Sequence, residues 1–144
     1  MYQKKFDEWN VLKQDINDKK AQITIRVGDV RWIMFGTNVG SEIDGKGQLF
    51  LRPGLVMNVI GHDLALVVPM TSKEKQPPRY IPFEANGRSG SLCLHQMKVI
   101  SQNRILHRIE RISDTRLSDV RQQVAVFFEL QLKMIEEGVD CPIA

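Results

Sequence analysis

Cysteine, histidine and long apolar runs are all scarce in this 144-residue sequence. The two cysteines, Cys93 and Cys141, lie far apart in a chain large enough to fold without a covalent staple. We therefore expect two reduced thiols rather than a disulfide framework. The three histidines do not follow the spacing of a metal-binding motif. Neither a metal site nor a cofactor is expected.

The apolar runs are too short to cross a membrane. The longest lie near residues 55–60, 64–70 and 124–128, far below the roughly 20 residues that a spanning helix needs. The N-terminus, MYQKKFDEWN, mixes charges of both signs with isolated aromatic residues and lacks the apolar core of a secretory signal. We expect a cytoplasmic protein that does not contact a membrane.

Positive charge is in slight excess. The formal net charge is +3 and the isoelectric point is near 9.0, which gives a mild attraction to polyanions. Lys73, Lys75 and Arg79 gather in one segment, and arginines recur from Arg104 to Arg121. Such clusters suit phosphate contacts. They are equally typical of a solvated surface or helix face, so charge alone leaves both interpretations open.

Apolar spacing predicts a helix at each end of the chain. The first, over residues 2–18, carries an apolar stripe at intervals of three and four, formed by Phe6, Trp9, Leu12 and Ile16. The second begins at Ser113 or Asp114 and keeps helical spacing to about residue 137, where Gly138 ends it.

Short strands rich in β-branched and aromatic residues are predicted between the helices. A strand over 28–35 precedes a long loop with four glycines, and a hairpin over 55–60 and 64–70 turns at 61–63. Further strands are expected at 80–83, 91–95, 99–101 and 104–109. This count predicts a mainly β fold with flanking helices (α+β), built as a small β-barrel. Residues 1–20 form the N-terminal helix and 23–137 the barrel with its C-terminal helix, a single domain overall.

Four motifs follow one another in a fixed order from Gly28. The chain opens a strand with GD, continues with GSEIDG in the loop, then RPGLV, and ends a later strand with PMTS. This ordered set, over most of residues 28–130, resembles the MazF/PemK family. The resemblance implies an SH3-like barrel assembled as a homodimer, paired with a cognate antitoxin and, through it, with operator DNA. It also implies the toxin of a type II toxin-antitoxin system, which cleaves single-stranded RNA at short motifs without a metal.

Arg52 and Thr71 are the first candidates for a catalytic site. The guanidinium of Arg52 is permanently charged, and its planar donors match a phosphate. Thr71 and Ser72 follow an apolar strand, where hydroxyl groups reach solvent and can hold a phosphate. The alternatives are a surface arginine and ordinary turn chemistry. By the resemblance, Thr71 matches the family's catalytic threonine, and Ser72 is only its neighbour.

Glu42 and His95 are the further catalytic candidates. Glu42 matches the family's loop glutamate, which serves either as a base or, as we favour, as a loop anchor paired with Lys46 or Arg52. Cys93 and His95 lie two apart on a predicted strand, but a zinc site or a cysteine nucleophile needs more ligands or partners. Plasmid-borne members of the family carry Arg and Asp at these two positions. A histidine can do the same proton work near neutral pH, or stack on a base, or only pack.

RNA contacts are expected from side chains around these candidates, namely Ser72, Lys46, Lys73, Lys75, Arg79 and Gln96. Gln96 should point to the opposite face of the strand from His95. Two other functions remain as alternatives. A gyrase-inhibiting toxin like CcdB shares the barrel but ends in Trp-Gly-Ile, whereas this chain ends in VDCPIA. A non-catalytic SH3-like nucleic-acid or protein-binding module would not depend on Arg52.

Overall fold

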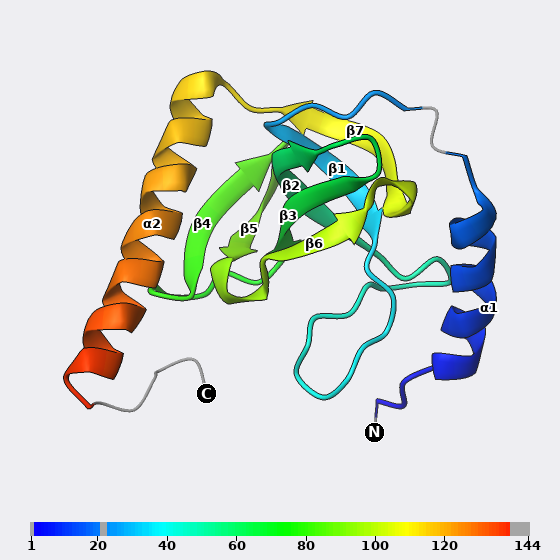
Figure 1. Ribbon diagram of the computed structural model, residues 1–144, viewed down its shortest axis with the longest axis horizontal. Helices are drawn as coiled ribbons and strands as arrows, with labels where there is room; N and C mark the ends of the chain where they lie inside the picture. Colours follow the sequence, from blue (N-terminus) through cyan, green and yellow to red (C-terminus); the bar gives the residue numbers. More distant parts are fainter. Residues whose placement is uncertain (1, 21–22, 139–144) are drawn as a thin grey trace.

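A strongly curled antiparallel sheet forms the centre of the protein, with one helix on each side of it (Figure 1). The computed structural model describes residues 2–20 and 23–138. Its elements are α1 (Phe6–Asp18), β1 (Asp29–Met34), β2 (Leu51–Ile60), β3 (Leu64–Thr71), β4 (Tyr80–Ala85), β5 (Arg88–Cys93), β6 (Lys98–Ser101), β7 (Ile105–Arg111) and α2 (Asp114–Glu136). The predicted mainly β fold with flanking helices is confirmed. The final segment VDCPIA, residues 139–144, which contains Cys141, lies outside the described residues.

The strand order is β4-β5-β3-β2-β1-β7, and β6 pairs with β3 as well. The predicted β2–β3 hairpin is present and turns at Gly61, whose φ is +62°. β4 and β5 turn at Asn86 and Gly87, both with positive φ, as a tight hairpin turn requires. β3 pairs with β6 along its first half and with β5 at its end. The end of β3 is therefore the corner where the sheet bends into a half-barrel.

The apolar core lies on both faces of the curled sheet. One cluster joins β1–β5 to α2, which contributes Leu117, Val120 and Phe127. Ile33, Phe35, Val56, Val67 and Ile105 belong to a second cluster, on the other side of the strands. The alternation of these side chains along β1 and β2 follows from the two-residue period of a strand. Both faces are thus covered, and the ends of the strands remain open for a site.

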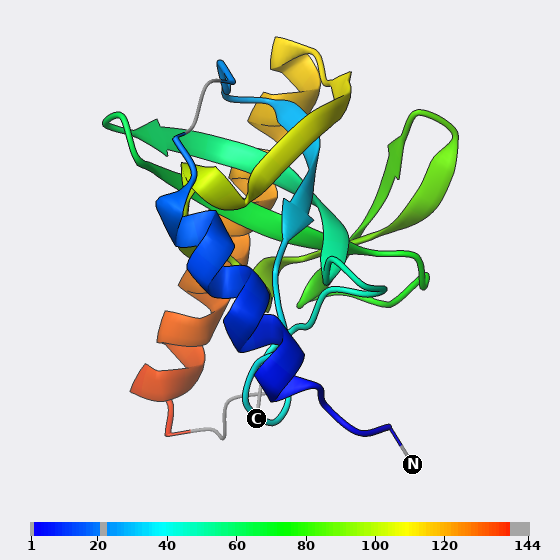
Figure 2. The same cartoon turned by 90° about the vertical axis from the view of Figure 1, so that its right-hand side faces the viewer.

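Helix α1 packs on its own barrel, as Figure 2 shows. Its apolar stripe buries Trp9 and Ile16, and the Trp9 ring lies 5.4 Å from that of Phe50. The side chain of Asn103 donates to the carbonyls of Ile16 and Lys19 and so satisfies the end of the helix. The helix begins at Phe6, later than the predicted residue 2.

Several predicted strand boundaries differ from the structure, since β2 begins at Leu51 and β5 at Arg88, each earlier than predicted. Two further differences lie close to 3₁₀ turns. The strand predicted over 91–95 ends at Cys93, because Leu94–Gln96 form a 3₁₀ turn, η1, in which the buried Leu94 donates its N–H to the Arg79 carbonyl. The strand predicted from Arg104 begins at Ile105, after a second such turn, η2 (Gln102–Arg104). His95 and Gln96 therefore lie on a turn instead of a strand. No helix within residues 2–20 and 23–138 is long and apolar enough to span a membrane.

Candidate functional site

A hollow of about 440 Å³ lies where the ends of β3 and β5 meet η1 and the β1–β2 loop, residues 35–50. Most of the predicted site residues line it together: Lys46, Arg52, Thr71, Lys73, Lys75, Arg79, His95 and Gln96. Residues that sequence reasoning did not assign to the site also line it, namely Ser41, Ile43 and Tyr80. Among the described residues, no carboxylate lines the hollow. The site therefore concentrates positive charge around a half-open space.

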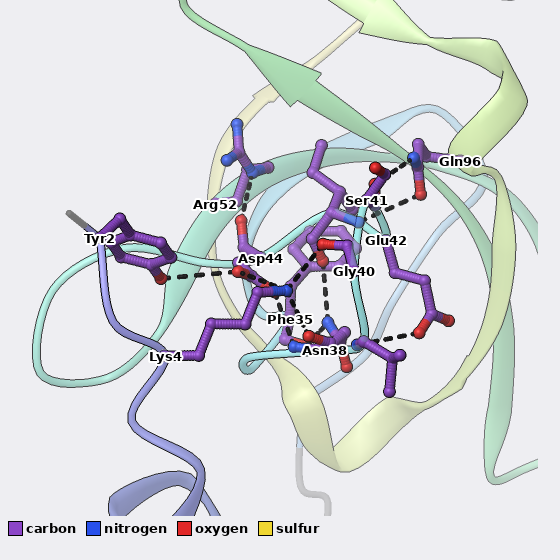
Figure 3. A network of polar contacts seen from close by, with 12 residues as sticks. Tyr2, Lys4, Phe35, Asn38, Gly40, Ser41, Glu42, Asp44, Arg52 and Gln96 are labelled. Atoms are coloured by element: carbon purple, nitrogen blue, oxygen red, sulfur yellow. Dashed lines mark hydrogen bonds and ion pairs between the residues drawn. The ribbon is translucent and has the colours of Figure 1, made fainter. Parts of the chain in front are cut away.

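Arg52 is fixed by two backbone carbonyls. Its Nε donates to the carbonyl of Asp44 at 2.7 Å (Figure 3). One terminal nitrogen, Nη1, donates to the carbonyl of Met70 at 3.3 Å. The other terminal nitrogen makes no hydrogen bond within the described part of the chain. Burial lowers the pKa of the guanidinium, and nearby Cys93 and Asp44 oppose that shift. An arginine held on one side in this way presents its remaining donors in a set direction.

Thr71 ends β3 beside β5. Its hydroxyl oxygen accepts a hydrogen bond from the Lys73 N–H at 3.4 Å, so the hydroxyl hydrogen is left to donate elsewhere. Gly90 of β5 lies against its backbone: a Cβ there would come within 1.9 Å of the Thr71 carbonyl oxygen. Ser72 is exposed and lines a neighbouring hollow instead. Close approach of two strands thus sets the position of Thr71.

His95 and Cys93 face the same hollow from successive elements. Nδ1 of His95 is buried without a hydrogen bond to the described residues. The centre of the His95 ring lies 5.1 Å from that of the Tyr80 ring, and the two rings meet in a T-shaped arrangement. Burial and the charges of Arg79 and Lys75 lower the pKa of His95, while the Arg79 backbone carbonyl opposes them. Burial raises the pKa of Cys93 to about 11, so this thiol is protonated near neutral pH. The lowered pKa favours the neutral imidazole of His95 near neutral pH, and a protonated thiol such as that of Cys93 is a poor nucleophile.

The basic residues form a cluster on one wall of the hollow. The Lys75 ammonium lies 5.0 Å from the centre of the Tyr80 ring, and the Arg79 guanidinium lies 5.8 Å from it. These contacts hold the cations over an aromatic face. Tyr80 carried no signal of its own in the sequence, beyond its place next to Arg79.

Glu42 and Gln96 both belong to the support of the loop. Glu42 does not line the hollow, and its carboxylate accepts from the Val39 N–H at 3.0 Å rather than pairing with Lys46 or Arg52. Gln96 was expected on the opposite face, yet it lines the hollow, because η1 replaces the strand. Its amide accepts from Ile43 N–H at 3.1 Å and donates to the Ser41 carbonyl at 3.0 Å (Figure 3).

The arginines of the second half do not converge on the hollow. Arg111 and Arg31 enclose the fully buried carboxylate of Asp29, at 2.9 and 3.2 Å. Arg104 lies over the ring of Trp9, and Arg116 over that of Phe83. These residues hold strands and helices together. Among the described residues, the basic side chains that line the hollow are instead Lys46, Arg52, Lys73, Lys75 and Arg79.

A second hollow of about 430 Å³ adjoins the first and shares Lys46, Arg52 and Thr71 with it. Its other walls include Trp32, Pro53 and Met70, with Arg88 placed 5.0 Å from the Trp32 ring. The exposed lining surface of this second hollow is mostly apolar, whereas that of the first hollow is mostly polar.

The fold and the site together define a small SH3-like barrel protein with a basic hollow suited to a phosphate-bearing polymer. A comparison with protein families matches residues 26–128 to the family described as PemK-like, MazF-like toxin of type II toxin-antitoxin system. The chain belongs to this family, as its ordered motifs predicted. A comparison with curated proteins gave no match.

Solved structures with the same fold include members of such systems. MazF from Deinococcus radiodurans is 22% identical with a TM-score of 0.61, covering 75% of this chain and 99% of its own. An endoribonuclease from Mycobacterial species, solved in complex with its cognate antitoxin, is 11% identical with a TM-score of 0.55, covering 74% and 97%. Another endoribonuclease from Mycobacterial species is 8% identical with a TM-score of 0.56, covering 85% and 100%. At these identities the likeness is one of fold.

Proposed function

We propose that the chain is an endoribonuclease toxin that cleaves single-stranded RNA at a short sequence motif without a metal ion. The observation that carries the proposal is the hollow in which Arg52, Thr71 and His95 meet a cluster of cations. The solved structures that share the fold of this chain include two endoribonucleases and a MazF toxin. The family membership supports the role of a toxin.

The reaction begins with attack of the ribose 2′-oxygen on the adjacent phosphorus. The bond from phosphorus to the 5′-oxygen breaks, and the departing oxygen takes a proton from water, which leaves a cyclic phosphate on one product and a hydroxyl on the other. Negative charge grows on the phosphoryl oxygens as this happens. The free terminal nitrogen of Arg52 and the Thr71 hydroxyl are the donors for these oxygens. Because Arg52 is already held by the carbonyls of Asp44 and Met70, it needs little rearrangement.

His95 is the base that takes the 2′-hydroxyl proton. Its lowered pKa keeps the imidazole neutral at physiological pH, which is the form that accepts a proton. Because Nδ1 is buried, Nε2 is the ring nitrogen that accepts the proton from the substrate. Glu42 is instead a residue that anchors the loop, consistent with its hydrogen bond to Val39.

Independence from metal follows from the charges around the substrate. Phosphate charge is balanced here by Lys46, Lys73, Lys75 and Arg79, and hard divalent cations bind carboxylate-rich sites instead. The adjoining hollow with Trp32 receives a base next to the cleaved bond, because a flat ring packs well on an aromatic wall. Selectivity for a motif comes from such base contacts.

The basic surface of the hollow is also the basis for the partners that we propose. An antitoxin lays an acidic, partly disordered segment along the hollow and competes for Arg52 and the lysines, since such segments wrap basic surfaces. Complexes of MazE with MazF among the solved neighbours support a protein antitoxin. A homodimer, and operator DNA bound through the antitoxin, complete the assembly. An antitoxin that binds only the opposite face and leaves cleavage unaffected would reject this arrangement.

The deciding experiment incubates the pure protein with a long single-stranded RNA in the presence of EDTA and maps the product ends. We expect cuts at one repeated short motif, with a cyclic phosphate on one side of each cut. The Arg52→Ala variant, purified in the same way, controls for contaminating nucleases. RNA left intact by the parent, together with inhibition of DNA gyrase, would refute the nuclease and favour a CcdB-like action.

A further inference from the structure

The N-terminal segment, residues 2–18, contacts the β1–β2 loop at the tip of the loop. The Lys4 ammonium lies 3.4 Å from the Asp44 carboxylate, and it donates to the carbonyls of Asn38 and Gly40 (Figure 3). The side chains of Lys4 and Asp44 are only 19% and 15% exposed. A lysine shielded to this degree, with three oxygen partners on one loop, makes stronger contacts than an exposed surface pair.

The same segment also holds both ends of the loop. Trp9 of α1 covers Gly36, where a Cβ would come within 2.2 Å of the Trp9 ring, and its ring packs at a tilt of 57° against that of Phe50. The Gly36 N–H donates to the Phe50 carbonyl, so the two ends are joined beneath the helix. Residues 2–18 therefore clamp the loop at its base through Trp9 and at its tip through Lys4.

This loop is part of the site. Ser41, Ile43 and Lys46 line the hollow, and the carbonyl of Asp44 holds Arg52 at Nε. The carboxylate of Asp44 accepts the Asn38 N–H at 2.6 Å and faces Lys4 on its other side. One residue thus connects Lys4 to Arg52, with its side chain toward the clamp and its backbone toward the site.

We propose that Lys4 is a positioning residue for Arg52, acting through the β1–β2 loop, and that residues 2–18 serve as a built-in clamp on this loop. The proposal rests on the proposed nuclease function for its effect on rate, whereas the clamp itself does not. Lys4 does not line the hollow, so it acts without touching the substrate. The family match begins at residue 26, so the clamp lies outside the matched region.

The test compares Lys4→Ala, Lys4→Arg and Lys5→Ala with the parent protein. Lys5 is the matched control, because its side chain is 66% exposed and its ammonium pairs, within the described part of the chain, only with Glu8, at 3.9 Å. Hydrogen exchange of the Asn38 and Gly45 amides reports on the loop, and kcat and KM on a short RNA report on the site. For Lys4→Ala, exchange at these amides should rise on the order of tenfold. The kcat should fall roughly tenfold with a smaller change in KM.

Lys4→Arg should return the amide exchange rates and kcat toward the parental values. Lys5→Ala should match the parent in both measurements. Unchanged exchange in Lys4→Ala would overturn the clamp. Faster exchange with unchanged kcat in an active parent would overturn the positioning of Arg52. A parent that does not cut RNA at all would instead refute the proposed function, and the exchange rates would then decide the clamp on their own.

Discussion

Replacing Arg52 with alanine tests the site more directly than any other change. Two of its three guanidinium nitrogens are committed to the Asp44 and Met70 carbonyls, which leaves one terminal nitrogen free for the substrate. Removing one preorganised donor from a transition state with developing charge costs on the order of a hundredfold to a thousandfold in rate. We therefore expect a loss of that size in single-turnover cleavage of a short labelled RNA, together with loss of toxicity in cells.

The same substitution has a cost in stability that must be separated from the loss of rate. The two carbonyls lose a charged donor, and water can replace it only in part, because Met70 is almost fully buried and Asp44 is partly buried. The free energy of unfolding should fall by about 2 kcal/mol, within the range for hydrogen bonds to a charged group. Circular dichroism should then show a Tm lower by roughly 5–8 °C and an unchanged folded spectrum.

Arg52→Lys serves as the matched variant, because it keeps the positive charge and loses the planar set of donors. Its rate should fall between those of the parent and the alanine variant. If Arg52→Ala cleaves RNA at more than about half the parental rate, the substitution has almost no effect compared with the loss expected for a missing donor. That result would show that Arg52 does not act on the substrate.

Three further changes test the rest of the site. If His95 is the base, cleavage should rise with pH through an apparent pKa below its ordinary value of 6.5, since its neutral form is active and its pKa is lowered. His95→Gln should remove that acidic limb, and a limb that persists would reject this role. Thr71→Ala should lose less rate than Arg52→Ala, because a neutral hydroxyl contributes less than a charged donor, and an equal or greater loss would reverse their roles. Gly90→Ala should lower the free energy of unfolding by roughly 1–3 kcal/mol through a clash with the Thr71 carbonyl, and an unchanged Tm would contradict that close approach.

The sequence predicted the parts of the site that belong to ordered motifs. Arg52 was found because RPGLV opens a strand, and Thr71 was found because PMTS closes an apolar strand, and both motifs match the pattern of the family. The side of the strand on which Gln96 lies was predicted wrongly, because alternation along a strand was extended past Cys93, where the chain turns into η1. That turn depends on a hydrogen bond to Arg79, a contact too distant in sequence for periodicity to reveal.

Residues that act through contacts distant in sequence were also missed. Asp44 had no signal beyond its place in the loop motif, although it connects Lys4 to Arg52. The role of Glu42 stayed open in the sequence for a similar reason, since either a cation or a backbone amide can pair with a carboxylate. The arginines of the second half show the limit of charge counting, because Arg111 is used to satisfy the buried Asp29.

The buried thiol in the wall of the hollow has a consequence for redox chemistry. With a pKa of about 11, only on the order of one Cys93 thiol in ten thousand is ionised at pH 7, so alkylating agents and peroxide should react with it slowly. Its reactivity then reports on the wall around it. Any change that opens the hollow to water lowers the pKa of Cys93 and speeds the alkylation of this thiol. A bound RNA strand that covers the hollow slows this alkylation. The rate of alkylation at Cys93 can in this way report whether the hollow is occupied, without an added label.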